Sequence, residues 1–236
     1  MYKLFVVFHN KLYSEHLFYK PENVVFFGVN SQAIKNIPMF LSRFKQEFEF
    51  NLKIFHPMFQ ECGYNESSAI LHIGLNNLHS DSEYIGFTQY DIIWNTDSIK
   101  NFKSNTCYYA FAGFNDLEYN VFPFKFFLEK YNKFFNKGYD REEVEHLSMN
   151  KFRSSTPLIP LLSTFMIHKN IYESLFPFWR EMMFSLFVYL KINKHPYPKF
   201  HRYIAIVMER IIGLSLVLSP SIEDFTKVEM REIEKR

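Results

Sequence analysis

The sequence predicts an α/β protein in which an open mixed sheet is flanked by helices, all in one compact unit. Three observations support this fold class. Strand-like and helix-like segments alternate through the first hundred residues, a pattern typical of parallel strands joined by right-handed crossovers. The chain of 236 residues is long enough to bury one sizeable core. No internal repeat and no low-complexity linker divides it.

Five segments carry this alternation. Short apolar runs between polar residues predict buried strands, and apolar residues at helical spacing predict helices. The predicted strands are Leu4–Phe8, Asn23–Val29 and Tyr84–Phe87, and the predicted helices are Ser31–Phe48 and Asn65–Leu78. Asn65 can cap the second helix, and Glu66 is favoured in its first turn because the amino end of a helix attracts negative charge.

The rest of the chain is less regular. The segments predicted there are a short strand at Tyr108–Phe114, an aromatic-rich helix at Pro123–Phe135, a solvated loop or helix at Lys137–Asn150, a strand at Leu161–His168, a long helix or a helix pair broken near Pro177 at Lys169–Leu190, a loop at Asn193–Phe200 and a helix at Arg202–Leu218. Charges alternate in the last residues. We therefore predict one domain over residues 1–220 and a peripheral C-terminal helix or tail over residues 221–236.

Composition argues against several kinds of partner and location. The formal net charge is +2 without a concentrated basic stripe, which argues against nucleic acid because phosphate contacts need clustered cations. Cys62 and Cys107 stand apart, so they predict neither a disulfide framework nor a zinc site and fit a reducing compartment. The apolar run Leu4–Phe8 is too short for a signal peptide or a membrane span. A cytoplasmic protein without a transmembrane segment is expected.

Several familiar catalytic motifs are missing from the sequence. It contains no GxGxxG, Walker A, GxSxG or HExxH pattern, which argues against dinucleotide enzymes, ATPases, serine hydrolases and zinc proteases. The 29 Phe and 15 Tyr can supply buried area and stacking surfaces. The codon bias of an AT-rich genome explains the same excess, and the sequence leaves both explanations open.

The most informative segment is Gln89-Tyr90-Asp91, which follows the strand-like run Tyr84–Phe87. A carboxylate at the end of a strand lies at the carboxyl edge of the sheet, where α/β folds bind ligands. Positions i and i+2 of an extended segment project to the same side, so Gln89 and Asp91 could reach one ligand. Asp91 offers a hard oxygen to Mg²⁺ or Mn²⁺, whereas Gln89 offers a neutral carbonyl. An ordinary polar strand end is the alternative.

Four other groups are candidates, each with a structural alternative. The loop His9–Lys11 could meet a nucleotide through backbone N–H groups and a cation, or could be a simple polar turn. Glu66 could face a ligand, or could only complement the helix dipole. Glu209 and Arg210 interrupt an apolar helix, where Glu209 could act as a general base or the two could form a structural ion pair. His168 could bind a ligand, or could be an ordinary satisfied histidine.

Four segments, taken together and in this order, resemble a known family. They are GYNESSAILHIGLNN, EYIGFTQYD, STFMIHKNIYESLFPFW and YIAIVMERIIGLSL. They resemble bacterial capsular-polysaccharide glycosyltransferases and the relatives of these enzymes in large DNA viruses. The resemblance covers roughly Tyr64 to Leu216 and the opening strand. It implies a single-domain, Rossmann-like GT-A fold, a nucleotide-sugar donor and inversion at the anomeric carbon.

The resemblance also implies roles at the donor. Gln89-Tyr90-Asp91 matches the position where many GT-A enzymes hold a divalent metal and the donor diphosphate with Asp-x-Asp. Phe8, His9 and Lys11 match the donor-base loop, and Glu66 is expected beside the donor. Asp91 is the one expected ligand if Mn²⁺ or Mg²⁺ is used. Because the first carboxylate is missing, metal dependence is expected to be weak or absent.

On the acceptor side, the resemblance implies a base and two contacts. Glu209 falls 118 positions after Asp91, about where inverting GT-A enzymes often place the base that deprotonates the acceptor hydroxyl. Asp91 is the second candidate for this base, and His168 and Arg210 are expected to contact an oligosaccharide or glycoprotein acceptor. UDP is the expected donor nucleotide, with UDP-xylose as one candidate. The resemblance implies a role in capsular or viral capsid glycan synthesis, in the host cytoplasm if the protein is viral.

A rival hypothesis belongs to another class of function. The chain could be a non-catalytic glycan- or partner-binding module that keeps the α/β shell. The abundant aromatic residues and the missing Asp-x-Asp are both compatible with such a module.

Overall fold

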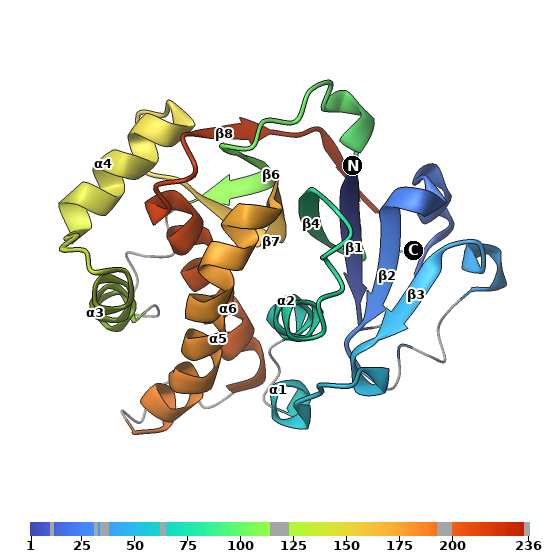
Figure 1. The fold of residues 1–236 in the computed structure, drawn as a ribbon, viewed down its shortest axis with the longest axis horizontal. Coiled ribbons are helices and arrows are strands. Elements are labelled where there is room, and N and C mark those ends of the chain that lie inside the picture. The colour runs from blue at the N-terminus through green and yellow to red at the C-terminus, as the bar shows by residue number, and fades with distance from the viewer. Residues whose placement is uncertain are drawn as a thin grey trace.

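The computed structural model describes residues 1–9, 12–30, 33, 38–61, 65–113, 123–192 and 200–233. Its centre is a seven-stranded sheet in the order β3-β2-β1-β4-β7-β6-β8 (Figure 1). The strands are β1 (Tyr2–Phe8), β2 (Val24–Gly28), β3 (Lys45–Phe48), β4 (Tyr84–Gln89), β6 (Thr106–Gly113), β7 (Ile159–His168) and β8 (Asp224–Lys227). Strand β7 is antiparallel to both neighbours, and the other neighbouring pairs are parallel. The predicted α/β fold class with an open mixed sheet is confirmed.

Both faces of the sheet are covered, which explains why the central strands read as continuous apolar runs. The helices are α1 (Pro57–Glu61), α2 (Glu66–Leu75), α3 (Phe124–Phe135), α4 (Arg141–Phe152), α5 (Lys169–Ile192) and α6 (Phe200–Leu218). Side chains of β1 alternate between the two faces. Phe5 and Val7 belong to the core formed with α2, α5 and α6, which contact one another (Figure 1). Leu4, Val6 and Phe8 belong to a second core on the opposite face.

That second core is closed by a two-stranded antiparallel sheet made of β5 (Ile92–Trp94) and β9 (Met230–Glu232). Trp94 is fully buried there, and the Tyr19 hydroxyl accepts a hydrogen bond from its backbone N–H at 2.8 Å. We call this two-stranded sheet the β5–β9 ribbon. In the β5–β9 ribbon, β5, which comes directly after β4 in the sequence, pairs with β9 near the C-terminus. The described part of the C-terminal segment therefore belongs to the packed structure.

Several predicted elements have the expected type. Helix α4 forms within the segment predicted as a loop or helix, and Asp140 caps it by accepting a hydrogen bond from the Glu143 N–H at 2.9 Å. Helix α5 runs unbroken through Pro177. The predicted loop Asn193–Phe200 lies outside the described residues up to residue 199.

One predicted helix is wrong, and the C-terminal segment has strands that the sequence did not indicate. The described part of Ser31–Phe48 forms a 3-10 turn (Met39–Leu41) and strand β3 rather than one helix, because Lys45–Phe48 pairs in parallel with β2 at the edge of the sheet. The C-terminal segment, predicted as a peripheral helix or tail, forms β8 and β9 in its described residues up to Ile233. Its apolar residues, Phe225, Val228 and Ile233, are buried against the sheet and the β5–β9 ribbon, which favours extended backbone over a solvated helix.

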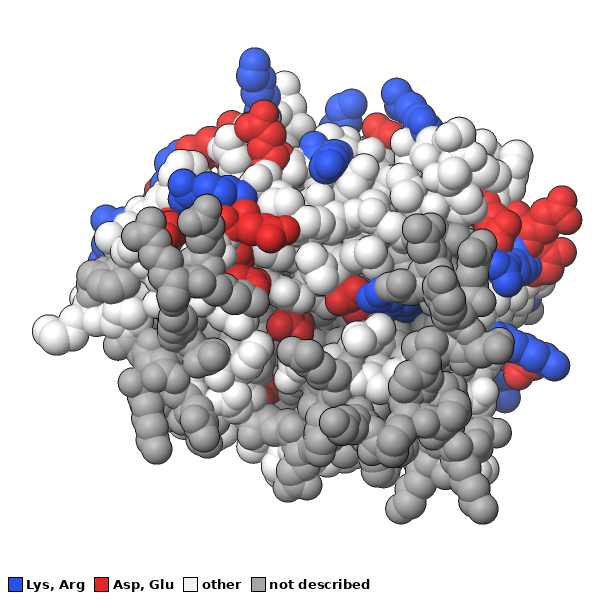
Figure 2. All heavy atoms as spheres, turned by 180° about the vertical axis from the view of Figure 1, so that it is seen from behind, with Lys and Arg blue, Asp and Glu red and all other residues white. Residues whose placement is uncertain are grey.

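Surface charge and hydropathy are unremarkable in the described part of the chain. No helix there is both long and apolar enough to cross a membrane. On the face shown in Figure 2, the described Lys and Arg side chains are spread among Asp and Glu side chains rather than gathered in one stripe.

Candidate active site at the carboxyl edge of the sheet

The parallel strands β1, β2 and β4 end at the same edge of the sheet. Phe8 lies opposite Gly28, and Val7 lies opposite Gln89. We call the residues that follow these strands, His9, Val29–Asn30 and Tyr90–Asp91, the carboxyl edge. Ligand sites of open α/β sheets lie in this position.

Gln89 and Asp91 are at this edge, but not on one continuous strand. Gln89 is the last residue of β4, and Tyr90 and Asp91 form the turn into β5. The rule that positions i and i+2 face the same side therefore does not hold for this pair. The carbonyl of Asp91 accepts a hydrogen bond from Ile233 N–H at 2.8 Å, which fixes the turn against the β5–β9 ribbon.

Three carboxylates from separate elements interact here: Glu66 begins α2, Asp91 follows β4 and Glu209 lies in α6. Burial, together with the negative charges of Glu209 and Asp91, raises the pKa of Glu66 to about 7, although a hydrogen bond with the backbone acts in the opposite direction. Glu66 retains some solvent exposure, although its carboxyl is densely surrounded by protein. We call Glu66, Asp91 and Glu209 the acid cluster. The structure thus brings together three residues that the sequence predicted as separate candidates.

Glu209 forms an ion pair with the neighbouring Arg210. The Arg210 guanidinium donates a hydrogen bond to Glu209, and both side chains are nearly buried, at 10% and 12% exposure. The pair is therefore not a solvated surface ion pair. One turn later, α6 lies tightly on β7, because a Cβ at Gly213 would be 2.5 Å from the carbonyl oxygen of Pro160. This close packing fixes the position of Glu209.

Helix α2, which Glu66 begins, is anchored by a buried network that the sequence analysis missed. Glu49, at the end of β3, accepts hydrogen bonds from Ser68 Oγ at 2.6 Å and from His72 Nδ1 at 3.0 Å. His72 Nε2 accepts a hydrogen bond from the His56 N–H at 3.0 Å, so the ring proton is on Nδ1. Ser68, His72 and Glu49 are fully or almost fully buried. Two polar residues four positions apart inside the apolar helix α2 were the signal for this network.

Aromatic rings gather beside Asp91. The ring of Tyr90 is stacked on Tyr13, with centroids 6.3 Å apart and planes at 6°, and it meets the edge of His9 at 5.1 Å. His16 is buried next to Tyr13, and burial lowers the pKa of its imidazole. The sequence prediction included His9 but not Tyr13 or Tyr90 as donor contacts.

Two other predicted donor contacts, Phe8 and Lys11, are not among the residues that the structure places at the site. Phe8 is fully buried and packs edge-on against Phe48 at 6.1 Å, so its side chain belongs to the core instead of the donor-base loop. Lys11 lies outside the described residues.

His168 lies at the opposite end of β4 from the carboxyl edge. It pairs with Tyr84, the first residue of β4, and its Nδ1 accepts a hydrogen bond from the Asn170 N–H at 3.2 Å at the start of α5. Because Tyr84 and Gln89 are at opposite ends of β4, the structure does not bring His168 to the acid cluster. Its predicted acceptor role has no support from this placement.

The described residues offer no complete metal site. No three His, Cys, Asp or Glu side chains in this part of the chain are grouped so that they could hold a metal ion. The acid cluster therefore interacts through charge without forming a ready-made ligand set. Asp91 is one potential ligand, and the use of Mn²⁺ or Mg²⁺ stays a prediction.

A bulge in β7 adds backbone strain at the same edge. Leu162 and Ser163 have φ of 59° and 45°, and the β6–β7 register shifts beside them. Positive φ angles are sterically unfavourable for residues other than glycine, and β-bulges are frequent next to functional sites. The pairing of β4 with β7 ends at Phe87 and Phe165, two residues from the bulge.

Comparisons with known proteins bear on the fold. No family model and no curated protein matches the sequence. Among solved structures, the apo form of the bifunctional glycosyltransferase WbbM matches 99% of this chain with a TM-score of 0.58 and 9% sequence identity. This chain spans 45% of that protein, less than half its length. The likeness shows that the chain has the fold of a glycosyltransferase, consistent with the GT-A architecture.

Proposed function

We propose that this protein is a glycosyltransferase that moves a sugar from a nucleotide-sugar donor to a hydroxyl group of a glycan acceptor. The observation that carries the proposal is the acid cluster at the carboxyl edge, in which the pKa of Glu66 is raised to about 7. Titratable groups shifted in this way by burial and neighbouring charges are frequent at catalytic sites. The fold likeness to WbbM supports the same class of activity.

The donor would bind across the carboxyl edge. Its base would stack on the aromatic residues Tyr13, Tyr90 and His9, which offer flat faces in a partly buried position. Its ribose and diphosphate would then lie near Asp91. UDP is the expected nucleotide, and a pentose such as xylose is one candidate sugar. These finer assignments, like a capsular or viral capsid setting, rest on the sequence resemblance.

The reaction needs a base for the acceptor hydroxyl. In an inverting transfer, the hydroxyl proton passes to a carboxylate, the acceptor oxygen bonds to the anomeric carbon, and the bond from that carbon to the nucleoside diphosphate breaks. A general base works best when its pKa is near the operating pH, a condition that Glu66 meets. Glu209 is a poorer candidate because Arg210 already neutralises its charge. We therefore assign the base to Glu66 and an orienting role at the acceptor to the Glu209–Arg210 pair.

The test is turnover of a panel of UDP-, GDP- and TDP-sugars, with and without Mn²⁺, by the intact chain and two variants. Glu66→Gln should lower kcat about 100- to 10,000-fold while donor binding is retained. Glu209→Gln should have a smaller effect on kcat and raise the acceptor KM. If Glu66→Gln keeps near-normal turnover and Glu209→Gln does not, the base is Glu209. If the intact chain neither binds nor turns over any nucleotide sugar, it is a binding module.

A further inference from the structure

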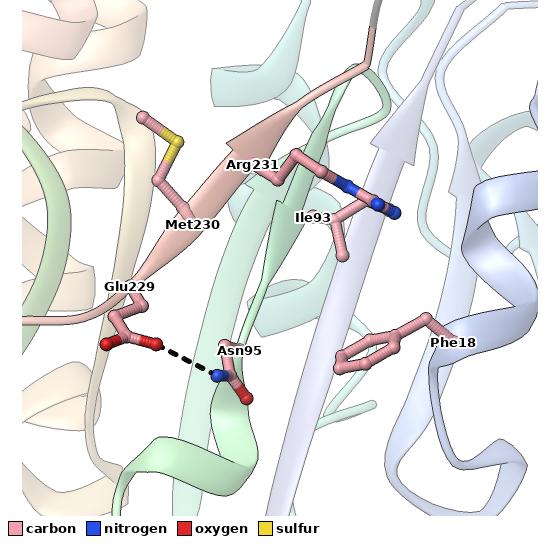
Figure 3. Close-up of a pocket in the computed structure, with 6 residues that line it drawn as sticks. All are labelled: Phe18, Ile93, Asn95, Glu229, Met230 and Arg231. Carbon is pink, nitrogen blue, oxygen red and sulfur yellow. Dashed lines mark hydrogen bonds between the residues drawn. The ribbon is translucent and has the colours of Figure 1, made fainter.

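A pocket beside the β5–β9 ribbon is not part of the acid cluster. It has a volume of about 260 Å³. The residues lining it are Phe18, Ile93, Asn95, Glu229, Met230 and Arg231 (Figure 3). They come from three separate parts of the chain: a 3-10 turn (Ser14–Phe18), strand β5 with the residue that follows it, and the segment that forms β9.

The walls combine one aromatic ring with planar polar groups. Phe18 is 57% exposed, and in Figure 3 its ring points toward Asn95 across the pocket. Asn95 donates from Nδ2 to Glu229 Oε2 at 3.1 Å, and its backbone N–H donates to the Glu229 carbonyl at 2.9 Å. These two bonds preorganise the polar wall. Arg231 extends over the other end of the pocket (Figure 3).

The balance of charge points to a neutral ligand. Among the described residues that line the pocket, Arg231 is the one cation, and it is offset by Glu229 in the same wall and by the charge of Glu15 nearby. A phosphate or a nucleic-acid backbone would need a surplus of positive charge. Hydroxyl groups, in contrast, can accept from a guanidinium, donate to a carboxylate and do both with an amide. The C–H face of a sugar ring can cover the exposed ring of Phe18.

The residues that line the pocket are also linked through the β5–β9 ribbon to Asp91 of the candidate active site. Ile93 in its wall pairs with Arg231 across the ribbon and lies two residues after Asp91, about 7 Å along an extended chain. Ile233, two residues beyond Arg231, donates to the Asp91 carbonyl. We infer that the pocket binds one neutral sugar residue of the acceptor glycan, so that the glycan runs along the ribbon toward the acid cluster. This inference rests on the proposed glycosyltransferase function.

The experiment is a titration of the ¹⁵N-labelled intact chain with galactose, glucose, xylose and lactose, and separately with inorganic phosphate. The signals to follow are the Asn95 side-chain amide and the backbone amides of Met230 and Arg231. At least one sugar should shift them saturably, and phosphate should not. Phe18→Ala should weaken this binding about tenfold. The matched control is Leu17→Ala, which removes a neighbouring exposed apolar side chain outside the pocket and should change nothing.

The outcomes separate this inference from the proposed function. If no sugar shifts these signals, or if Phe18→Ala and Leu17→Ala behave alike, the subsite does not exist, even where nucleotide-sugar turnover is intact. Shifts caused by phosphate alone would make it an anion site and overturn the inference. If sugars bind but no nucleotide sugar is turned over, the acceptor role falls together with the proposed function. With active enzyme, Phe18→Ala should raise the acceptor KM about tenfold, leaving kcat and donor KM unchanged.

Discussion

Replacing Glu66 with Gln should stabilise the protein at alkaline pH, because the folded structure disfavours the ionised carboxylate. The pKa of Glu66 is about 7 in the folded protein, against 4.5 for an unperturbed glutamate. Between these two values the folded state binds more protons than the unfolded state, so the free energy of unfolding falls as pH rises through that window. The difference corresponds to roughly 3 kcal/mol at full ionisation, at 1.36 kcal/mol per pKa unit. Gln keeps the shape of the side chain and removes the charge.

Unfolding by urea and by heat, at pH 4 and at pH 8, measures the effect. At pH 4 the wild-type carboxyl is largely protonated in both states, so the two proteins should be about equally stable. At pH 8, Glu66→Gln should gain up to roughly 3 kcal/mol, which is about 6–12 °C in Tm for a chain of this size. Glu142→Gln is the control, since Glu142 is exposed in the first turn of α4.

A Glu66→Gln variant that loses stability at pH 8, or gains the same amount at both pH values, would refute this reasoning. In that case the carboxylate of Glu66 is compensated in the fold, and its assignment as a tuned base loses its basis. The expected variant is more stable and less active at once. That combination is typical of residues kept for function at a cost to the fold.

Two further substitutions probe how the acid cluster is supported. His72→Ala removes one of the hydrogen-bond donors to the buried Glu49 carboxylate. The free energy of unfolding, measured with urea at neutral pH, should fall by about 3–5 kcal/mol. A loss below about 1 kcal/mol would show that the network is not important for stability. Gly213→Ala would push a methyl group against the carbonyl oxygen of Pro160, so it should cost about 1–3 kcal/mol and lower turnover by displacing α6. Gly138→Ala should do neither, because an added Cβ there would meet no described atom within 4 Å beyond its chain neighbours.

The sequence predicted the centre of the fold better than its edges. Strands β1, β2 and β4 are buried on both faces, so each is a continuous apolar run that a short window detects. Strands β3, β8 and β9 are short, partly exposed and paired at edges or in the small ribbon. Their polar and charged residues resemble helix surface or tail. Only their pairing with distant strands makes them extended, and β9 pairs with a strand more than 130 residues earlier.

The candidate site was predictable residue by residue but not as a set. Glu66, Asp91 and Glu209 each stand out as a charged residue beside an apolar run. Their meeting depends on the crossover that carries α2 back over β1 and on the packing of α6 against β7. Tyr13 lies in an irregular segment, where no periodicity distinguishes an aromatic residue at a site from one in the core. Phe8 shows the converse difficulty, because the last residue of a strand can face either side of the sheet, and the side chain of Phe8 is buried in the core.

The proposed choice of Glu66 over Glu209 as the base rests on this spatial arrangement and on nothing local in the sequence. One cation, Arg210, lies on Glu209, while Glu66 is surrounded by protein and by the charges of two other carboxylates. In the proposed mechanism these different environments separate the roles: Glu209, paired with Arg210, would orient a ligand, and Glu66 would take up and release a proton near neutral pH. A change in the environment of Glu209 should therefore be felt at Glu66. Arg210→Leu would remove the cation from Glu209, which should raise the pKa of Glu66 further and shift the acid limb of the kcat profile to higher pH. An unchanged pH profile in this variant would show that the three carboxylates do not act as one cluster.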